Sequence, residues 1–366
     1  MIVICDALCQ DFVHEEANAG VVNEIFNNEK QDAIILSDKK HYQNLSYIIK
    51  QRTEYKQTIL FKKLLVPSKL LRKINFDKYL DPYNVKKILS FCKKNAIKQI
   101  VFLSITGRQL DTLNKELDKK NKIDVLIILH GIVSELEQNN KTSLFKKSYI
   151  NSHKNIKFVL LSPHIEHNLN KMGFNNGKCF TIDHPYVWNK TIKKSYSHSP
   201  LKICAIGYIH NEKGRVYIER LINQLADTSG DFQFHILGSL EYSVKDSRVK
   251  IFNRRFTREE LDKLVPKYDY ILVPYSFDGY SLKVSGIFFD AINYNTPIIT
   301  FKNTFTKYYF NKLGNIGYML DSEEGMNNLI MKLIMDKRED EIKIMIENLE
   351  KAKDKLSFSF LKLLDH

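Results

Sequence analysis

Ser285, Gly286 and Asp290 have residue types and a spacing that suit the binding of a phosphorylated ligand. Ser285 is a good N-cap and predicts a helix over residues 284–294. Backbone N–H groups at such a helix start point at an anion, and a diphosphate is a natural guest. Lys283 would add positive charge just outside the helix, and Asp290 could accept hydrogen bonds from ribose hydroxyls. The plainer interpretation is a capped helix whose acid is favoured by the helix dipole.

A second candidate phosphate contact lies upstream, where the apolar stretch 202–207 predicts a strand ending at Gly207. A glycine at that point lets a ligand approach the backbone closely. Lys213 lies where its ammonium could reach a phosphate. The segment is neither a dinucleotide fingerprint nor a P-loop, so it supports neither a dinucleotide nor an ATP site. An ordinary strand–helix turn explains it equally well.

Taken together, these residues resemble the C-terminal signature of GT-B glycosyltransferases of the broad group 1 (family 4-like) class. Asp290 and the alanine after it fall on the second Glu-Ala of that signature, and residues 296–299 fall on its Thr-Pro-Val-Ile. Gly207 and Lys213 resemble the Gly-Arg and Lys-Gly pattern whose basic residues hold the donor diphosphate. The resemblance implies a GT-B fold, which is two Rossmann-like, doubly wound α/β domains facing a cleft.

The chain also departs from that signature. Tyr208 stands at the arginine position, and Leu282 stands where the first acid of the Glu-x7-Glu pair is expected. The contact to the donor sugar is therefore absent or has moved to Asp278. The expected donor-binding residues are Gly207, Tyr208, Lys213, Lys283, Ser285, Gly286, Asp290 and Arg255.

Candidate catalytic residues come from the first half of the chain. His130 follows the apolar stretch 124–129, and the resemblance implies that it faces the donor sugar. It could contact a sugar hydroxyl, or act as a base if the enzyme inverts. Glu15 and Glu16 lie where acceptor loops lie in the resembled class, so either carboxylate could deprotonate an acceptor hydroxyl. A loop histidine and an acidic first helical turn are the plainer interpretations. His14, His164 and His184 are further candidates at strand ends that face the same cleft.

The elements that must position these residues alternate between strand and helix patterns, which is typical of mostly parallel sheets covered on both faces. Residues 188–200 are polar and basic and predict a linker between two such halves. We therefore expect an N-terminal acceptor-binding domain over 1–190 and a nucleotide-sugar-binding domain over 196–340. The resemblance implies that a C-terminal helix in 341–366 packs back on the first domain.

Composition narrows the class of protein. The chain has 366 residues and a formal net charge of +14 at pH 7, which suggests an anionic partner. Its five cysteines form no CxxC pair, which argues against a disulfide framework or a zinc site and fits a reducing compartment. The apolar N-terminal stretch predicts a buried strand, and the sequence has no apolar run long enough for a membrane span. We therefore expect a cytoplasmic protein.

Positive charge is concentrated in residues 57–78, where apolar residues recur at helical spacing interrupted by Pro67. Such a basic amphipathic segment suits docking on the anionic inner face of the cell membrane. The favoured hypothesis is thus a hexosyltransferase that uses a nucleotide-diphosphate sugar and a lipid-linked or surface-polysaccharide acceptor such as capsule or O-antigen. No metal and no other cofactor is expected, because helix dipole and basic side chains can neutralise a leaving diphosphate.

Two other functions remain open from the sequence. A GT-B-fold sugar-nucleotide epimerase or hydrolase would bind the same donor but would need no membrane surface. A non-enzymatic basic binding protein would explain the charge, but the sequence carries no RNA-binding or DNA-binding motif.

Overall fold

The computed structural model describes residues 1–11, 13–29, 32–53, 59–64, 76–117, 123–137, 143–174, 177–194, 199–275, 277 and 279–356. Within these residues the chain divides into two compact units. The first comprises Met1–Val187 with the short segment Leu282–Val284, and the second comprises Trp188–Ser281 with Ser285–Leu356. The division between Val187 and Trp188 lies close to the expected end of the N-terminal domain.

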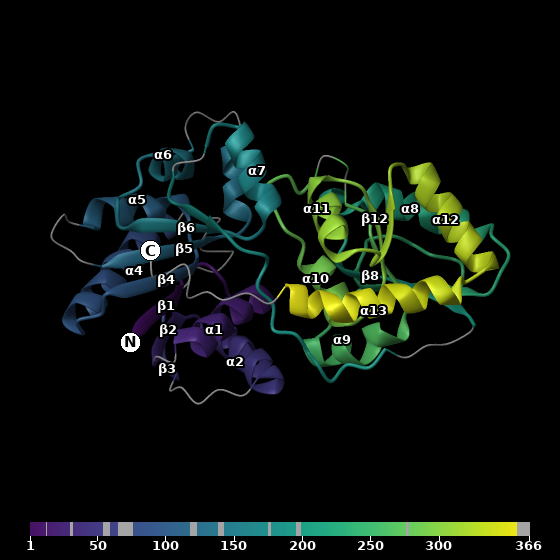
Figure 1. The fold of residues 1–366 in the computed structure, drawn as a ribbon, viewed down its shortest axis with the longest axis horizontal. Coiled ribbons are helices and arrows are strands. Elements are labelled where there is room, and N and C mark those ends of the chain that lie inside the picture. The colour runs from purple at the N-terminus through teal and green to yellow at the C-terminus, as the bar shows by residue number, and fades with distance from the viewer. Residues whose placement is uncertain are drawn as a thin grey trace. The chain divides into compact units, whose positions relative to one another are not determined.

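The first unit is built on a parallel sheet, shown in Figure 1, whose described strands follow the order β3-β2-β1-β4-β5-β6-β7. The order reverses direction between β1 and β4, which makes the carboxyl ends of these two strands the switch point of the sheet. The strands are β1 (Ile2–Asp6), β2 (Ala33–Ser37), β3 (Ile59–Lys63), β4 (Gln99–Ser104), β5 (Asp124–Leu129), β6 (Ile156–Leu160) and β7 (Cys179–Thr181).

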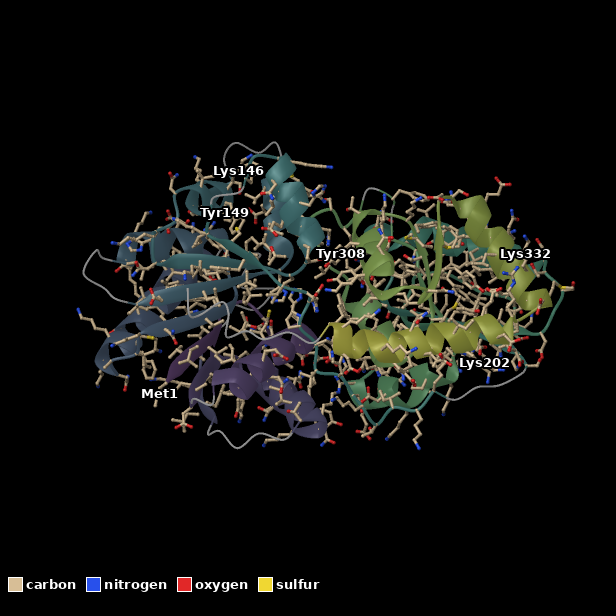
Figure 2. The ribbon with its side chains drawn as sticks, viewed as in Figure 1. Met1, Lys146, Tyr149, Lys202, Tyr308 and Lys332 are labelled. Atoms are coloured by element: carbon tan, nitrogen blue, oxygen red, sulfur yellow. The ribbon has the colours of Figure 1, made fainter. Side chains whose placement is uncertain are left out.

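Helices cover both faces of this sheet, so its strands β1 and β2 are buried along their whole length. In β1, Ile4 packs with α1 and α2 on one face, whereas Val3 packs with α4 and α5 on the other. Tyr149, labelled in Figure 2, lies in the second of these cores with its ring centroid 4.8 Å from that of Phe158. The helices are α1 (Glu15–Glu29), α2 (Lys39–Arg52), α4 (Asp77–Lys94), α5 (Gly107–Glu116), α6 (Leu144–Ile150) and α7 (Pro163–Lys171).

The prediction of an amphipathic helix within residues 57–78 is wrong for residues 59–63. Residues 59–63 form β3, which pairs in parallel with β2 at the edge of the sheet. Leu60 is exposed and the following Phe61 stacks on Tyr42, so the side chains alternate between two faces as a strand requires. Pro67 lies outside the described residues.

The second unit repeats the architecture with a parallel sheet of order β10-β9-β8-β11-β12-β13 among the described residues. Its switch point is between β8 and β11. The strands are β8 (Leu201–Tyr208), β9 (Phe232–Ser239), β10 (Val249–Ile251), β11 (Tyr270–Val273), β12 (Ile298–Phe301) and β13 (Gly317–Leu320). The helices are α8 (Arg215–Ala226), α9 (Arg258–Leu264), α10 (Gly286–Asn293), α11 (Thr304–Leu313), α12 (Glu323–Met335) and α13 (Glu339–Lys355).

The C-terminal helix α13, the long yellow helix in Figure 1, belongs to the second unit and runs beside α10 and α11. The expectation that a C-terminal helix in 341–366 packs back on the first domain stays a prediction. Ile342 and Met345 are buried in the core of the second unit, which fixes the helix there. Residues 357–366 lie outside the described residues.

Leu282, at the position where a sugar-binding acid was expected, is a core residue of the first unit. It is 1% exposed and packs with the cluster that contains Phe158 and Leu160. The chain therefore uses this position to attach the loop before α10 to the first unit. None of the described helices is long and apolar enough to cross a membrane.

We expect Leu282→Ala to destabilise the first unit by about 2–5 kcal/mol, because it removes a buried side chain and leaves a cavity. Hydrogen exchange of the amides in β4 and β5 would measure this, since it reports the stability of one unit separately. The control is Leu144→Ala, which truncates a leucine that is 38% exposed in the same unit. Equal exchange in both variants would contradict the core assignment.

Candidate functional site

The start of α10 has the N-cap that the sequence predicts. The Ser285 hydroxyl accepts a hydrogen bond from the backbone N–H of Phe288 at 3.2 Å, and it lies 2.6 Å from the hydroxyl of Tyr275. Gly286 is exposed, and a side chain at this position would contact nothing within 4 Å. The Ser285 side chain is thus committed to the cap, and the open backbone beside it leaves room for an anion at the helix start.

The turn after β8 brings an ammonium to the switch point of the second sheet. Gly207 has a φ of +90°, and a Cβ atom there would lie 3.6 Å from Lys213 Nζ. Gly214, with a φ of +74°, packs so closely that a Cβ atom would lie 2.2 Å from the Pro274 carbonyl oxygen. Glycine is therefore required at 214, and this close packing of the turn on the end of β11 positions Lys213.

Lys213 and Asp290 form one electrostatic cluster. Burial lowers the pKa of Lys213, and the charge of Asp290 opposes that shift. Ile287, one turn before Asp290 on α10, lies within 3.9 Å of the position that a side chain on Gly207 would occupy. The end of β8, the Lys213 ammonium and one face of α10 therefore converge.

Asp290 has a partner that the sequence patterns did not identify. Arg258 Nη1, from the first residue of α9, lies 2.7 Å from Asp290 Oδ1, and both side chains are largely buried. Arg255, the arginine expected from the sequence to contact the donor, is exposed in the loop before α9. The pair links positions 32 residues apart, so no local spacing signals it.

The remaining donor candidates have separate positions. Tyr208 at the end of β8 is 56% exposed, with its ring centroid 6.0 Å from that of His210. Lys283 belongs to the segment that packs in the first unit, and its carbonyl oxygen lies 3.2 Å from His164 Nε2. Asp278 lies outside the described residues.

In the first unit the structure brings three of the candidate histidines together. The rings of His14 and His130 lie 4.6 Å apart by centroid and are tilted by 30°. His184 is the third member of this group. Positive charge on His184, like positive charge on His14, disfavours protonation of His130. These residues come from the loop before α1, the end of β5 and the segment after β7.

The environment keeps these imidazoles neutral. Burial places the pKa of His130 well below its usual range, and burial together with the His14 charge lowers that of His184 to about 3. Within the described residues, the buried Nε2 atom of His130 has no hydrogen-bond partner. A neutral imidazole with an unused nitrogen can accept a hydrogen bond or a proton from a hydroxyl group.

His164 and Glu16 have partners that indicate structural roles. His164 is buried with Nδ1 2.7 Å from the Ser162 hydroxyl, and Nε2 contacts the Lys283 carbonyl. Glu16 Oε2 lies 2.8 Å from Arg52 Nη1 in a buried ion pair, and Arg52 also donates to the carbonyl of Val187.

One group of described residues has the composition of a metal site. Single ligand atoms of Asp6, Cys9 and His41 lie within 4.8 Å of one another. Burial and the nearby Asp6 charge raise the pKa of Cys9 well above its usual range, which favours the thiol over the thiolate form that metals bind. His41 and Asp6 contact each other directly at 3.1 Å. The group is therefore a hydrogen-bond network.

No protein-family model and no curated protein matches this sequence. Solved structures match along nearly the whole chain. A glycosyltransferase from Rickettsia africae ESF-5 has a TM-score of 0.66 at 14% identity, covering 99% of this chain and 95% of that chain. HepE of Anabaena in complex with UDP has a TM-score of 0.67 at 12% identity, covering 100% and 97%. The lipopolysaccharide outer core galactosyltransferase WaaB has a TM-score of 0.56 at 13% identity, covering 97% and 98%.

These likenesses confirm the fold class. The chain has the GT-B fold of glycosyltransferases, with two doubly wound α/β units, as its resemblance to group 1 enzymes implied. The shared feature is the fold, and the arrangement of Lys213, Arg258 and Asp290 is a property of this chain.

We expect Arg258→Ala to lower the stability of the second unit by about 1–3 kcal/mol, because it removes the cation that lies 2.7 Å from the buried Asp290 carboxylate. The measurement is hydrogen exchange of the amides in β11 and β12. Arg220→Ala is the control, since it removes an exposed ion pair with Glu323 that should contribute less than about 1 kcal/mol.

A double-mutant cycle sharpens this test. If Arg258 and Asp290 interact as the structure shows, Asp290→Asn should be far less damaging in the Arg258→Ala background than in the wild type. Additive effects of the two substitutions would contradict the ion pair.

Proposed function

We propose that this protein is a glycosyltransferase that transfers a hexose from a nucleotide-diphosphate sugar to a lipid-linked or surface-polysaccharide acceptor. One observation carries the proposal: Lys213 and Asp290 converge with the start of α10 at the switch point of the second sheet. In doubly wound sheets, ligands bind outside the carboxyl ends of the strands at this point. The fold shared with known glycosyltransferases supports the choice of reaction.

The second unit would bind the donor nucleotide. The diphosphate would lie against the start of α10 and the Lys213 ammonium. Burial removes water from this ammonium and disfavours its charge, and a bound anion would compensate that loss. Ribose hydroxyls would donate to the Asp290 carboxylate, which Arg258 holds in a fixed orientation. A uridine nucleotide is the first to test, since HepE was solved with UDP.

Charge stabilisation of the departing diphosphate would come from the same groups. Negative charge builds up on the leaving oxygen as the sugar bond breaks, and preorganised N–H groups and an ammonium stabilise it. We therefore propose that transfer needs no metal ion. In the first unit, His130 would contact a hydroxyl through its buried Nε2 atom, or take the acceptor proton.

We also propose that the protein docks on the inner face of the cell membrane. Support comes from α4 and the residue before it, where Phe76, Tyr79 and Tyr83 are 44%, 67% and 54% exposed at helical spacing. The Lys78 and Lys87 ammonium groups lie 5.5 Å from the ring centroids of Tyr79 and Tyr83. Exposed aromatic rings with lysines between them suit the boundary between anionic headgroups and acyl chains.

Donor binding should raise the melting temperature of the protein. Among UDP-, GDP- and CMP-sugars, we expect one nucleotide class to stabilise it by about 2.7 kcal/mol at a concentration one hundred times its dissociation constant. Lys213→Ala and Asp290→Ala should remove most of this shift, whereas Lys307→Ala, which alters an exposed lysine of the same unit, should keep it.

The proposal fails if no nucleotide produces a shift. If a nucleotide sugar binds and its free sugar or an epimer is the only product with every acceptor tested, the protein is a hydrolase or epimerase instead. Mass spectrometry of the reaction products distinguishes these outcomes.

Vesicle flotation tests membrane docking. The protein should float with vesicles rich in phosphatidylglycerol at low salt and less at high salt, because each basic residue near the surface contributes roughly 1 kcal/mol that salt screens. Replacing Phe76, Tyr79 and Tyr83 together with serine should abolish flotation. The matched control is Tyr47→Ser, which removes an exposed aromatic residue from α2. Flotation unchanged by the triple substitution would contradict docking through α4.

A further inference from the structure

The switch point of the first sheet is filled by protein groups. Asp6, at the end of β1, is fully buried, and its Oδ1 atom accepts hydrogen bonds from the Ser104 hydroxyl at 2.6 Å and the Cys9 backbone N–H at 2.9 Å. Its Oδ2 atom accepts from Asn18 Nδ2 at 2.6 Å and lies 3.1 Å from His41 Nε2. So many donors favour an ionised carboxylate and hold its pKa well below the usual range, against the opposing effect of burial.

The His41 ring lies between two oxygen atoms. Its Nδ1 atom is 2.8 Å from the carbonyl oxygen of Asp11, which can only accept, and its Nε2 atom faces the ionised Asp6 carboxylate. Both nitrogens must therefore carry protons. A neutral ring that accepts from Asn18 across 3.2 Å would leave a bare nitrogen facing Asp6. The short Asn18–His41 distance instead follows from both groups donating to one oxygen.

The contact to Asp11 connects this ion pair with the loop that carries His14. Asp11 and His14 both have a φ of +54°, a left-handed conformation that is unfavourable for these residues and persists only when their surroundings enforce it. Besides His41, Lys40 holds Asp11 through an ion pair of 3.2 Å, which is exposed and therefore weak. The buried His41 contact is the stronger restraint on the loop.

We propose that His41 is a positioning residue: as an imidazolium fixed between Asp6 and Asp11, it holds the loop after β1 so that the His14 ring lies against the ring of His130. The contacts of His41 with Asp6 and Asp11, and of His14 with His130, do not depend on the proposed function. Only the chemical role of His130 rests on that function. His41 itself would touch no substrate.

The groups around His41 decide how firmly it keeps its proton. Burial and its place in the first turn of α2 disfavour the charge, although the Asp38 carboxylate caps that turn. Asp6, the Asp11 carbonyl and the charge of Glu15 favour it and outweigh burial, so the pKa of His41 is raised. Burial lowers the pKa of His14, and positive charge on His41 acts in the same direction, whereas the Asp6 charge opposes it.

The sign of the pH dependence follows from both partners. Because the pKa of His41 is raised in the folded state, its contribution to stability is complete below the ordinary histidine pKa and is lost as pH rises through the raised value. Because the pKa of Asp6 is lowered, its contribution is present above the ordinary value near 4 and is lost as pH falls. The contact between Asp6 and His41 should thus be intact around neutral pH.

Two-bond proton–nitrogen NMR of the histidine rings in the full-length protein tests this without any substrate. At neutral pH both His41 nitrogens should have imidazolium shifts, and His41 should titrate above the ordinary histidine pKa. Wild-type protein should also show a ring-to-ring nuclear Overhauser effect between His14 and His130 that fades over the pH range in which His41 loses its proton.

Variants separate positioning from general stability. His41→Gln should lose the His14–His130 signal, whereas His167→Gln should keep it. A neutral His41 ring at neutral pH, or a His14–His130 signal that persists in folded His41→Gln, would overturn the proposal. If His41→Gln does not fold, the wild-type titration decides, because it needs no substitution. Since none of these measurements uses a nucleotide sugar, a failed donor screen leaves this result unaffected.

Discussion

Burial of the Asp6 carboxylate at the switch point of the first sheet is the constraint on which the histidine cluster depends. A charge in this position must be compensated, since an isolated buried carboxylate is strongly unfavourable. Compensation comes from the end of β4 through Ser104, from α1 through Asn18 and from α2 through His41. One carboxylate therefore ties together the two central strands, two helices and the loop that carries His14.

The second sheet uses the corresponding position in a different way. Where β1 ends in a fully compensated acid, β8 ends near Gly207, which adds no side chain, and the nearest charged group is the Lys213 ammonium. Lys213 is positioned by the contact between Gly214 and the Pro274 backbone. Two copies of one architecture thus have different electrostatics at their switch points, with a compensated acid in the first and a partly buried cation in the second.

The sequence predicted these elements wherever the signal was local. Ser285 capping α10, the strand ending at Gly207 and the helix over α4 follow from residue types and periodicity over a few residues. Residues 60 and 61 were predicted to be helical but lie in β3. An edge strand beside a lysine-rich segment can show the same apolar spacing as a helix. Leu282 showed that an expected acid was absent, but only the structure shows that the leucine packs in the first unit.

Long-range pairs are what the sequence could not provide. Arg258 and Asp290, or His41 and Asp6, are ordinary charged residues on amphipathic helices and strand ends until folding brings them together. The histidine cluster is an intermediate case, because strand ends in a parallel sheet meet at one edge and the sequence placed His14, His130 and His184 at such ends. Topology could therefore predict their proximity, whereas it could not predict which groups hold them.

The proposed donor site follows the same physical logic as the network around Asp6 and His41. Lys213 and Arg258 bring two positive charges toward the Asp290 carboxylate in a partly buried environment. Burial opposes the charge of Lys213, as its lowered pKa shows. A bound diphosphate would compensate that charge, and a neutral sugar could not. Recognition of the donor would then depend on its phosphates and ribose more than on its sugar, in keeping with the loss of the sugar-binding acid at Leu282.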